Sequence, residues 1–321
     1  MNHCAPDGAA DHRAFGSETT VQPPKDLIDD QTAGIYFLDR SRRIIYWSPG
    51  AERLTGYLSS DVLGRCCADR LLQHMDASGQ VLCNAGCPLE ATMRDGKGRA
   101  IELFLHHKKG HRVPVTVRAI PIRGLSGEIL GAVEVFNDVS GHDFAAERIR
   151  ELGTPTLIDP LTGAGNQRFA EVQIASRLAE KKRTGLTVGL LLVEIDSLGS
   201  INERYGHSAG ADTLAAVGRT LAHALRAGDF LARWDGGRFV ILAVGLEGRS
   251  LADAGQRVRA VVKRSGVPAR PGLKLSLSIG VTQARIGDTV ASLVARADAL
   301  RREAKSRGPD RVANDLDDYQ A

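Results

Sequence analysis

Residues 230–242 read Phe-Leu-Ala-Arg-Trp-Asp-Gly-Gly-Arg-Phe-Val-Ile-Leu. Two apolar runs, residues 230–232 and 240–242, flank the dipeptide Asp235-Gly236. Asp-Gly between apolar stretches is the strongest short-range signal for a two-residue β-hairpin, because both central positions of such a turn require positive φ. We therefore predict a tight hairpin whose turn is centred on Asp235 and Gly236.

The sequence around this hairpin alternates between helical and strand-like patterns. Upstream, the stretch Asp159-Pro-Leu-Thr-Gly-Ala-Gly-Asn166 opens the region. Apolar periodicity then predicts helices at about 166–183, 200–205, 209–226, 250–264 and 289–306 and strands at 187–195, 229–234, 238–244 and 273–283. Such alternation is typical of an α/β fold with a central sheet flanked by helices.

The first half of the chain has a different pattern, in which short strands are separated by turns. Residues 34–39 and 44–47 flank the polar run 40–43, which predicts a hairpin. Three further strands are expected at 101–107, 113–120 and 129–136, so the whole predicts an antiparallel five-stranded sheet with helices. Residues 1–25 mix Gly, Pro, Asp and Ser without a period, which predicts a disordered tail.

Bulk properties exclude several classes of protein. A length of 321 residues suggests about two domains, and 43% hydrophobic with 25% charged residues is an ordinary globular composition. A net charge of +4 without a Lys/Arg block does not indicate nucleic-acid binding. No apolar run approaches the ~20 residues that span a bilayer, so we expect no membrane segment and a cytoplasmic location. The five cysteines would then be mostly reduced.

The second half resembles the GGDEF family, the diguanylate cyclases that join two GTP molecules into cyclic di-GMP. The resemblance runs from about 159 to 312 and gives a domain at 159–315 followed by a tail at 316–321. It rests on the opening stretch 159–166, on Tyr-Gly-His-Ser-Ala-Gly at 205–210, on Ser-Ile-Gly-Val at 278–281 and on the hairpin.

Residues 26–140 resemble a PAS sensory domain, and a helical linker is expected at 141–158. The resemblance rests on short motifs at 34–39, 48–51, 54–57, 62–65 and 110–115, on Gly131, and on the ending Asp-Val-Ser at 138–140. It implies a sensor of an unknown ligand, and both families imply a homodimer that acts with an unknown partner protein.

The family's signature loop, Gly-Gly-Asp/Glu-Glu-Phe, falls on Asp235, Gly236, Gly237, Arg238 and Phe239. Gly and Arg stand where the resemblance puts the two acids, and Asp235, on the other arm of the turn, is not expected to replace them. Mg²⁺ requires hard oxygen ligands, and a guanidinium beside the ions would repel them. No catalytic residue of the loop is therefore intact. Arg238 is either a phosphate-binding cation or a solvated side chain at a hairpin tip.

Other positions carry part of the family's nucleotide site. Glu194 replaces the Asp that ligates the metal, which leaves a weak, vestigial ligand, and Mg²⁺ is expected only where a nucleotide binds. Asn202 keeps its place in the guanine-reading pair, whose other member is replaced by Ala211. Lys305 matches a phosphate contact, whereas a later Arg of the family falls on Pro309.

One family site keeps its residues. Arg226 and Asp229 form the Arg-x-x-Asp that many GGDEF domains use as an inhibitory site for cyclic di-GMP. Arg suits phosphate or the guanine Hoogsteen edge, and Asp accepts from guanine N–H groups. In the alternative interpretation, Arg226 ends a helix and Asp229 begins a strand, with no ligand.

Cysteines and histidines gather in the first half. Cys67, Cys83 and Cys87, with the pair His106 and His107, are candidates for a metal, haem or redox site, because thiolate and imidazole suit such groups. Free cysteines are also common as small buried hydrophobes.

Three functions follow from these observations. We favour a PAS–GGDEF protein that binds cyclic di-GMP without synthesising it. The alternatives are an active diguanylate cyclase with a tolerated variant loop and a dimeric interaction scaffold that binds no nucleotide.

Overall fold

The computed structural model describes residues 33–69, 71–84, 86–139, 157–226, 228–270 and 272–316. The chain forms two compact units, and each is described separately. Of the described residues, the first unit contains 33–76, 80–108 and 113–139, and the second contains the short segments 77–79 and 109–112 and everything from 157 onward. The expected tail at 1–25, most of the linker at 141–158 and nearly all of the tail at 316–321 lie outside the described residues.

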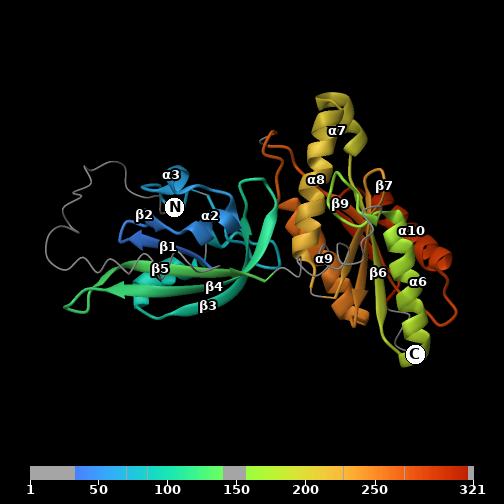
Figure 1. Ribbon diagram of the computed structural model, residues 1–321, viewed down its shortest axis with the longest axis horizontal. Coiled ribbons are helices and arrows are strands. Elements are labelled where there is room, and N and C mark those ends of the chain that lie inside the picture. Colours follow the sequence, from blue (N-terminus) through green and yellow to red (C-terminus); the bar gives the residue numbers. More distant parts are fainter. Residues whose placement is uncertain are drawn as a thin grey trace. The chain divides into compact units, whose positions relative to one another are not determined.

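The first unit is built on a five-stranded sheet in the order β2-β1-β5-β4-β3 (Figure 1). Its strands are β1 (Gly34–Asp39), β2 (Ile44–Trp47), β3 (Arg99–His106), β4 (Arg112–Arg123) and β5 (Ile129–Asp138). The pairings of β1 with β2, β1 with β5 and β4 with β5 are antiparallel.

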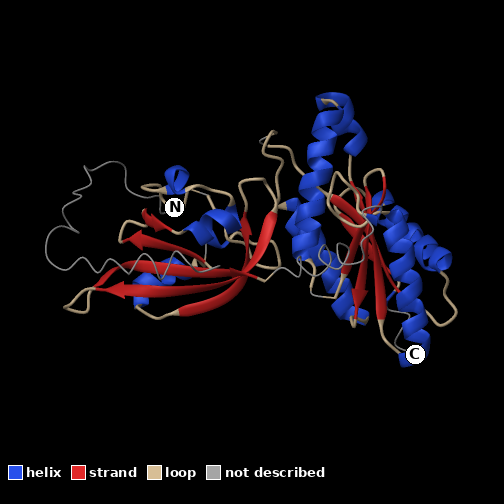
Figure 2. Ribbon diagram, viewed as in Figure 1, coloured by secondary structure: helices blue, strands red, loops and turns tan. Residues whose placement is uncertain are grey.

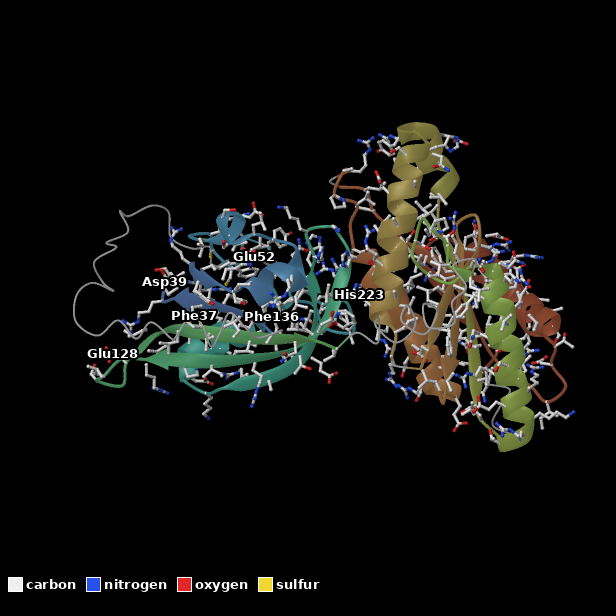
Figure 3. All side chains as sticks on the ribbon, viewed as in Figure 1. Phe37, Asp39, Glu52, Glu128, Phe136 and His223 are labelled. Carbon is white, nitrogen blue, oxygen red and sulfur yellow. The ribbon has the colours of Figure 1, made fainter. Side chains whose placement is uncertain are left out.

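Short helices cover this sheet. They are α2 (Pro49–Thr55), α3 (Ser59–Val62), the 3₁₀ turn η1 (Leu82–Asn84) and α4 (Pro88–Asp95). The core includes Tyr36 and Phe136, whose rings pack edge to face with centroids 6.2 Å apart; Phe136, labelled in Figure 3, is fully buried. Gly34 allows this packing, because a Cβ there would lie 2.2 Å from the Phe136 ring.

The second unit is a three-layer α/β sandwich. Its sheet has the order β10-β9-β6-β8-β7, formed by β6 (Val188–Ile195), β7 (Phe230–Asp235), β8 (Arg238–Val244), β9 (Leu277–Gln283) and β10 (Arg311–Asn314). The central strand β6 runs antiparallel to both β8 and β9, whereas β10 is parallel to β9.

Helices lie on both faces of this sheet (Figures 1 and 2). One face packs on α8 (His207–Ala224) and α9 (Gly248–Lys263), the other on α6 (Gln167–Thr184) and α10 (Val290–Ser306). A shorter helix, α7 (Leu198–Tyr205), follows β6. Because side chains alternate along a strand, Leu191 and Val193 face α8 and α9, and Leu190 and Leu192 face α6 and α10.

The expected fold class is confirmed in both units. The predicted helices and strands of the second unit are present with ends that differ by a few residues, and β10 was not predicted. A four-residue strand with one buried residue gives little hydrophobic periodicity, so sequence pattern alone does not reveal it.

Candidate functional site

The β7–β8 hairpin forms where it was predicted, but its turn differs from the expectation. Asp235 pairs with Arg238 across the ladder, so Gly236 and Gly237 are the central residues. Of these only Gly236 has positive φ, at 42°. The prediction of Asp235 and Gly236 at the centre, both with positive φ, was therefore wrong, because the second glycine moved the turn by one residue.

The hairpin tip is anchored to the end of β6. The Ile195 amide donates to the Gly237 carbonyl at 3.0 Å, and the Arg233 guanidinium donates to the Gly236 carbonyl at 2.9 and 3.1 Å. A Cβ on Gly237 would lie 2.8 Å from the Leu198 side chain, which covers the loop from the start of α7. These contacts fix the loop beside Glu194.

Arg238 is held by carboxylates. Its Nε donates to Oδ1 of Asp235 at 2.6 Å, its Nη2 pairs with Oδ2 of the same residue, and its Nη1 lies 3.4 Å from Oδ1 of Asp298 on α10. The hydrogen bonds to Asp235, more than any other effect, raise the pKa of Arg238. Of the two interpretations of Arg238, this geometry fits neither a solvated tip nor a guanidinium open to phosphate.

Glu194 is paired with cations of α10. As an even-numbered residue of β6 it points to the same face as Leu192, where α10 lies. Lys305 Nζ donates to its Oε1 at 2.5 Å, and Arg301 Nη1 pairs with its Oε2. Arg301 also donates from Nε to Oδ1 of Asp298 at 2.8 Å, which links Glu194 to the hairpin.

We call these side chains the hairpin charge network; its members are Glu194, Asp235, Asp298, Arg238, Arg301, Arg302 and Lys305. Burial alone would raise the pKa of Asp298, but hydrogen bonds from Arg301 and Arg302 outweigh burial and lower it. Within the described residues no group of three or more His, Cys, Asp or Glu side chains has the arrangement of a metal site. The carboxylates of the network are thus compensated by arginine and lysine.

An open groove of about 750 Å³ lies next to this network. Its floor is apolar, with Trp234 and Leu192 from the sheet and Val290 and Val294 from α10. Arg238, Asp298 and Arg302 of the network also line it. A volume of this size falls in the range of small-molecule sites.

Asp196, two residues after Glu194, has a structural role. Its carboxylate accepts from Ser278 Oγ at 2.7 Å, from Ser276 Oγ at 2.8 Å and from the Asp310 amide at 2.9 Å. These three hydrogen bonds join Asp196 to β9, to the residue before it and to the loop before β10. A buried carboxylate bonded in this way is a structural anchor.

Asn202 lies on α7 and packs against the start of α8. A Cβ at Gly210 would lie 1.8 Å from its Oδ1, so only glycine admits the amide at this distance. Ala211 follows on α8, and Asp212 is exposed. Asn202, which the resemblance assigns to guanine recognition, is therefore positioned against Gly210 at the start of α8.

Arg226 and Asp229 close a tight turn before β7. Oδ2 of Asp229 accepts from the Arg226 amide at 3.1 Å, and its Oδ1 accepts from the Val244 amide at 3.3 Å. Burial raises the pKa of Asp229, although these amides and the nearby Arg226 and Arg257 act against it. The Arg226 side chain is exposed.

Arg257 on α9 is a residue that the sequence analysis missed. Burial lowers its pKa, and the neighbouring Arg226 lowers it further. Two guanidiniums close to a single carboxylate, Asp229, give this corner a surplus of positive charge. No motif could have identified Arg257, because it lies 28 residues beyond Asp229 in a different helix.

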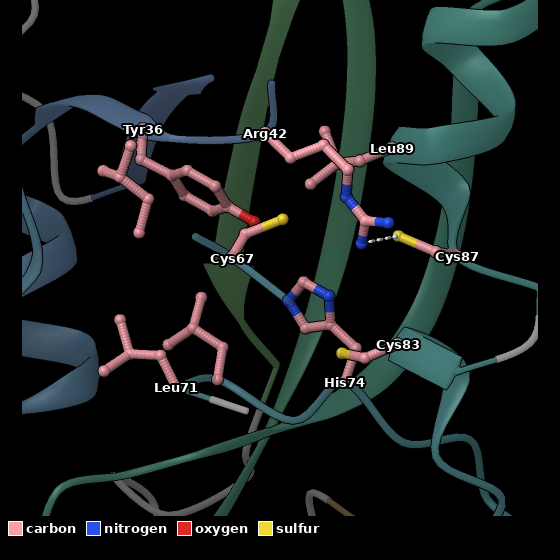
Figure 4. A pocket seen from close by; sticks show the side chains of 10 residues that line it. Tyr36, Arg42, Cys67, Leu71, His74, Cys83, Cys87 and Leu89 are labelled. Atoms are coloured by element: carbon pink, nitrogen blue, oxygen red, sulfur yellow. Dashed lines mark hydrogen bonds between the residues drawn. The ribbon is translucent and has the colours of Figure 1, made fainter. Parts of the chain in front are cut away.

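In the first unit, Cys67, Cys83 and Cys87 line one small cavity (Figure 4). They are free thiols, whereas Cys66 is disulfide-bonded, an exception to the expected reduced state. Neither His106 nor His107 lines the cavity; His74 does. His106 Nδ1 lies 3.3 Å from the Tyr57 hydroxyl, and His107 lies against Gly56.

Comparison with known proteins agrees with both units. Residues 156–311 match the family described as "Diguanylate cyclase, GGDEF domain", and residues 32–141 match the PAS domain. The chain contains a PAS domain followed by a GGDEF domain. No helix in the described ranges is long and apolar enough to cross a bilayer.

The PAS–GGDEF chain is similar to several curated proteins. It is 28% identical over 196 residues to diguanylate cyclase DosC of Escherichia coli K12, a match that covers 60% of this chain and 40% of DosC. It is 34% identical over 163 residues to response regulator PleD of Caulobacter vibrioides, covering 49% of this chain and 35% of PleD. These matches span less than half of each relative's length.

Among solved structures, the chain is similar to the crystal structure of diguanylate cyclase SiaD in complex with its activator SiaC from Pseudomonas aeruginosa. The TM-score is 0.49 at 30% identity, with 54% of this chain and 68% of that chain covered.

Proposed function

We propose that this chain is a cytoplasmic PAS–GGDEF signalling protein of the cyclic di-GMP network, whose GGDEF domain binds cyclic di-GMP without synthesising it. The observation that carries the proposal is the hairpin charge network. Where the family resemblance puts acids, Glu194 is paired with Arg301 and Lys305, and Arg238 is paired with Asp235 and Asp298.

The electrostatics of the network oppose Mg²⁺-dependent phosphoryl transfer. That chemistry relies on metal ions to bridge the phosphates and absorb the developing charge. A metal ion approaching Glu194 would have to displace Arg301, which is itself nearly buried and bonded to Asp298. At an effective dielectric near 20, a guanidinium about 4 Å from a divalent ion repels it by several kcal/mol.

The corner at Arg226 supports the binding half of the proposal. The Asp229 carboxylate accepts a hydrogen bond from the Arg226 amide and so holds the backbone of the turn. The Arg226 guanidinium is exposed, and Arg257 lies close enough for the two positive charges to affect each other. Cyclic di-GMP offers two phosphates and two guanine edges, for which arginine is the most suitable partner. The same proposal includes a homodimer, in which the domains of two chains pair.

An active diguanylate cyclase is the second candidate. In its favour, Glu194 keeps a carboxylate at the end of β6 and Lys305 and Asn202 keep their places. It requires the network to open when GTP and Mg²⁺ bind.

One experiment with two parts separates the candidates. Purified chain is incubated with GTP and Mg²⁺ and the products are resolved by chromatography; we expect no cyclic di-GMP, and turnover of ~1 s⁻¹ or more would establish the cyclase instead. Calorimetry then measures cyclic di-GMP binding to the wild type, to Arg226→Ala and to Arg249→Ala, an exposed arginine of α9 that serves as the control.

We expect Arg226→Ala to weaken binding by about 10- to 100-fold, the range for loss of charge-assisted hydrogen bonds, and Arg249→Ala to leave it unchanged. If the wild type binds no cyclic di-GMP, the receptor proposal fails and the interaction scaffold takes its place.

A further inference from the structure

The cavity in the PAS domain has an unusual lining for a hydrophobic core. Together with Ile44 and leucines, it is lined by Tyr36, Arg42, Cys67, His74, Cys83 and Cys87. Figure 4 shows the three thiols and the His74 imidazole directed toward the same space. A core built only for packing would be expected to place apolar side chains here.

Several buried polar atoms around this cavity have no hydrogen-bond partner. They are the Tyr36 hydroxyl, Arg42 Nε and Oε2 of Glu134, whose other oxygen, Oε1, lies 3.1 Å from His74 Nε2. Tyr36 and Glu134 are fully buried, and they are directly opposite each other on β1 and β5. Native proteins rarely leave buried polar atoms unsatisfied, so such a group of them indicates a missing polar or ionic partner.

The size of the cavity limits what that partner is. Its volume is about 10 Å³, which admits one water-sized particle. Haem, a flavin or a nucleotide does not fit this space. A single metal ion does, once it replaces the thiol protons.

We propose that Cys67, His74, Cys83 and Cys87 form a Cys₃His site for a soft divalent metal ion such as zinc. Three thiolates and one imidazole are a standard donor set for tetrahedral zinc. The proposal is independent of whether the GGDEF domain binds or makes cyclic di-GMP.

The chain segment that carries these four residues has little regular structure. Between α3 and α4 the described residues contain only η1 and isolated bridges, such as Arg43 with Cys66 and Met75 with Val81. Irregular stretches of this length inside compact domains are uncommon and are usually functional. A metal ion bound at four points along 67–87 would fix this segment against the sheet.

The surroundings of the four side chains suit a metal. His74 Nε2 lies 3.1 Å from Oε1 of Glu134, which leaves Nδ1 as the nitrogen for the ion. A carboxylate on the second nitrogen is the usual arrangement for a metal-ligating histidine. Arg42 Nη2 lies 3.9 Å from the Cys87 sulfur, and its charge offsets the surplus of three thiolates over one divalent ion.

The thiols do not have the environment of reactive cysteines. Burial, together with the neighbouring thiols, raises the pKa of Cys67 to about 12 and that of Cys83 to about 11, whereas reactive cysteines have lowered pKa values.

The four side chains do not yet have metal-site geometry, since no group of donors in the described residues is arranged to hold an ion. Binding must draw them together, which would repack Tyr36 and Leu89 around the cavity. Metal loading would then be a structural signal within the PAS domain.

The test uses the full chain, reduced and freed of metal with a chelator. Zinc is added and measured by elemental analysis, and cobalt(II) is added as a spectroscopic probe. We expect one zinc per chain, release of about three protons on binding, and the thiolate-to-cobalt charge-transfer bands of a tetrahedral site.

Two pairs of variants locate the site. Cys87→Ser should weaken zinc binding by at least about 10-fold, whereas Cys66→Ser, which changes a cysteine outside the cavity lining, should not. His74→Ala should likewise weaken zinc binding, whereas His107→Ala should leave it unchanged. Circular dichroism identifies any variant that fails to fold, and for such a variant the cobalt spectrum of the wild type decides.

The proposal is overturned by a wild type that binds no zinc or shows no thiolate bands with cobalt. Equal losses in Cys66→Ser and Cys87→Ser would also overturn it, as would the visible spectrum of haem or an iron–sulfur cluster in the purified chain.

Discussion

At the scale of single residues, Arg301 connects the two halves of the hairpin charge network. Its guanidinium bonds both Glu194 on β6 and Asp298 on its own helix, and its side chain is 9% exposed. The next residue, Arg302, also bonds Asp298 but is 72% exposed. The two arginines therefore form a matched pair with one shared partner and opposite burial.

We predict that Arg301→Met lowers the free energy of unfolding of the GGDEF domain by about 2–4 kcal/mol, because it leaves partly buried carboxylates undercompensated. Arg302→Met should cost no more than about 1 kcal/mol, as for exposed ion pairs. Urea denaturation followed by Trp234 fluorescence, in a Trp47→Phe background, measures both. Equal effects of the two substitutions would contradict the role given to Arg301.

The sequence predicted some features of these residues but not their partners. That Gly237 and Arg238 stand where the family resemblance expects acids is a prediction from the motif, since it needs only position along the chain. The partners of Arg238 and Glu194 could not be predicted, because Asp298 and Arg301 lie 60 and 107 residues away from the residues they bind. His74 lies between Cys67 and Cys83 in the sequence, but the prediction named the pair His106 and His107, which do not line the cavity.

At the scale of elements, the start of α10 sets the position of the cations that meet Glu194. Thr289 and Ser292 form a capping box, and Asp288 accepts from the Arg285 amide at 2.7 Å, from Ser292 Oγ at 2.8 Å and from Arg296 Nη2 at 2.7 Å. Burial alone would raise the pKa of Asp288, but these hydrogen bonds outweigh it and lower the pKa to about 2.

This lowered pKa predicts a pH dependence. A carboxyl group whose folded-state pKa is depressed stabilises the protein above its unfolded value, near 3.9, and that contribution is lost as the pH falls through about 2. We expect Asp288→Asn to reduce the loss of stability between pH 5 and pH 2 by about 1–2 kcal/mol.

The measurement is urea denaturation of the wild type and the variant across this pH range. Asp253→Asn, at an exposed carboxyl group of α9, is the control and should leave the pH dependence nearly unchanged. If Asp288→Asn lost as much stability as the wild type between pH 5 and pH 2, the Asp288 carboxylate would make no such contribution.

At the scale of the whole molecule, the two units have separate hydrophobic cores. One core lies on the PAS sheet, and two lie on opposite faces of the GGDEF sheet. Each unit contains one of the two tryptophans, Trp47 in the first and Trp234 in the second. Leu157 and Ile158 belong to the predicted linker at 141–158, and they pack on the core between the GGDEF sheet and helices α6 and α10.

We predict that residues 157–321, expressed alone, fold and unfold cooperatively, because both cores of the GGDEF domain are contained within them. Thermal or urea unfolding should give coincident transitions by Trp234 fluorescence and far-ultraviolet circular dichroism. A fragment that starts at 167 removes Leu157 and Ile158 with the opening stretch and should be less stable. A non-cooperative transition in the longer fragment would place the domain boundary elsewhere.

The sequence by itself determined the two fold classes, the order of the domains and the hairpin, because these depend on periodicity, turn residues and motifs that are local in the chain. It also predicted, from the family resemblance, that Gly237 and Arg238 stand where acids are expected. Only the tertiary structure decided what compensates the remaining charges and which cysteines and histidine share a cavity. The charged partners are distant in sequence, so they meet only when the sheet and the helices that cover it come together. The cysteines and the histidine all lie within 67–87, but this segment has little regular structure, so no periodicity predicts which of its side chains face the cavity.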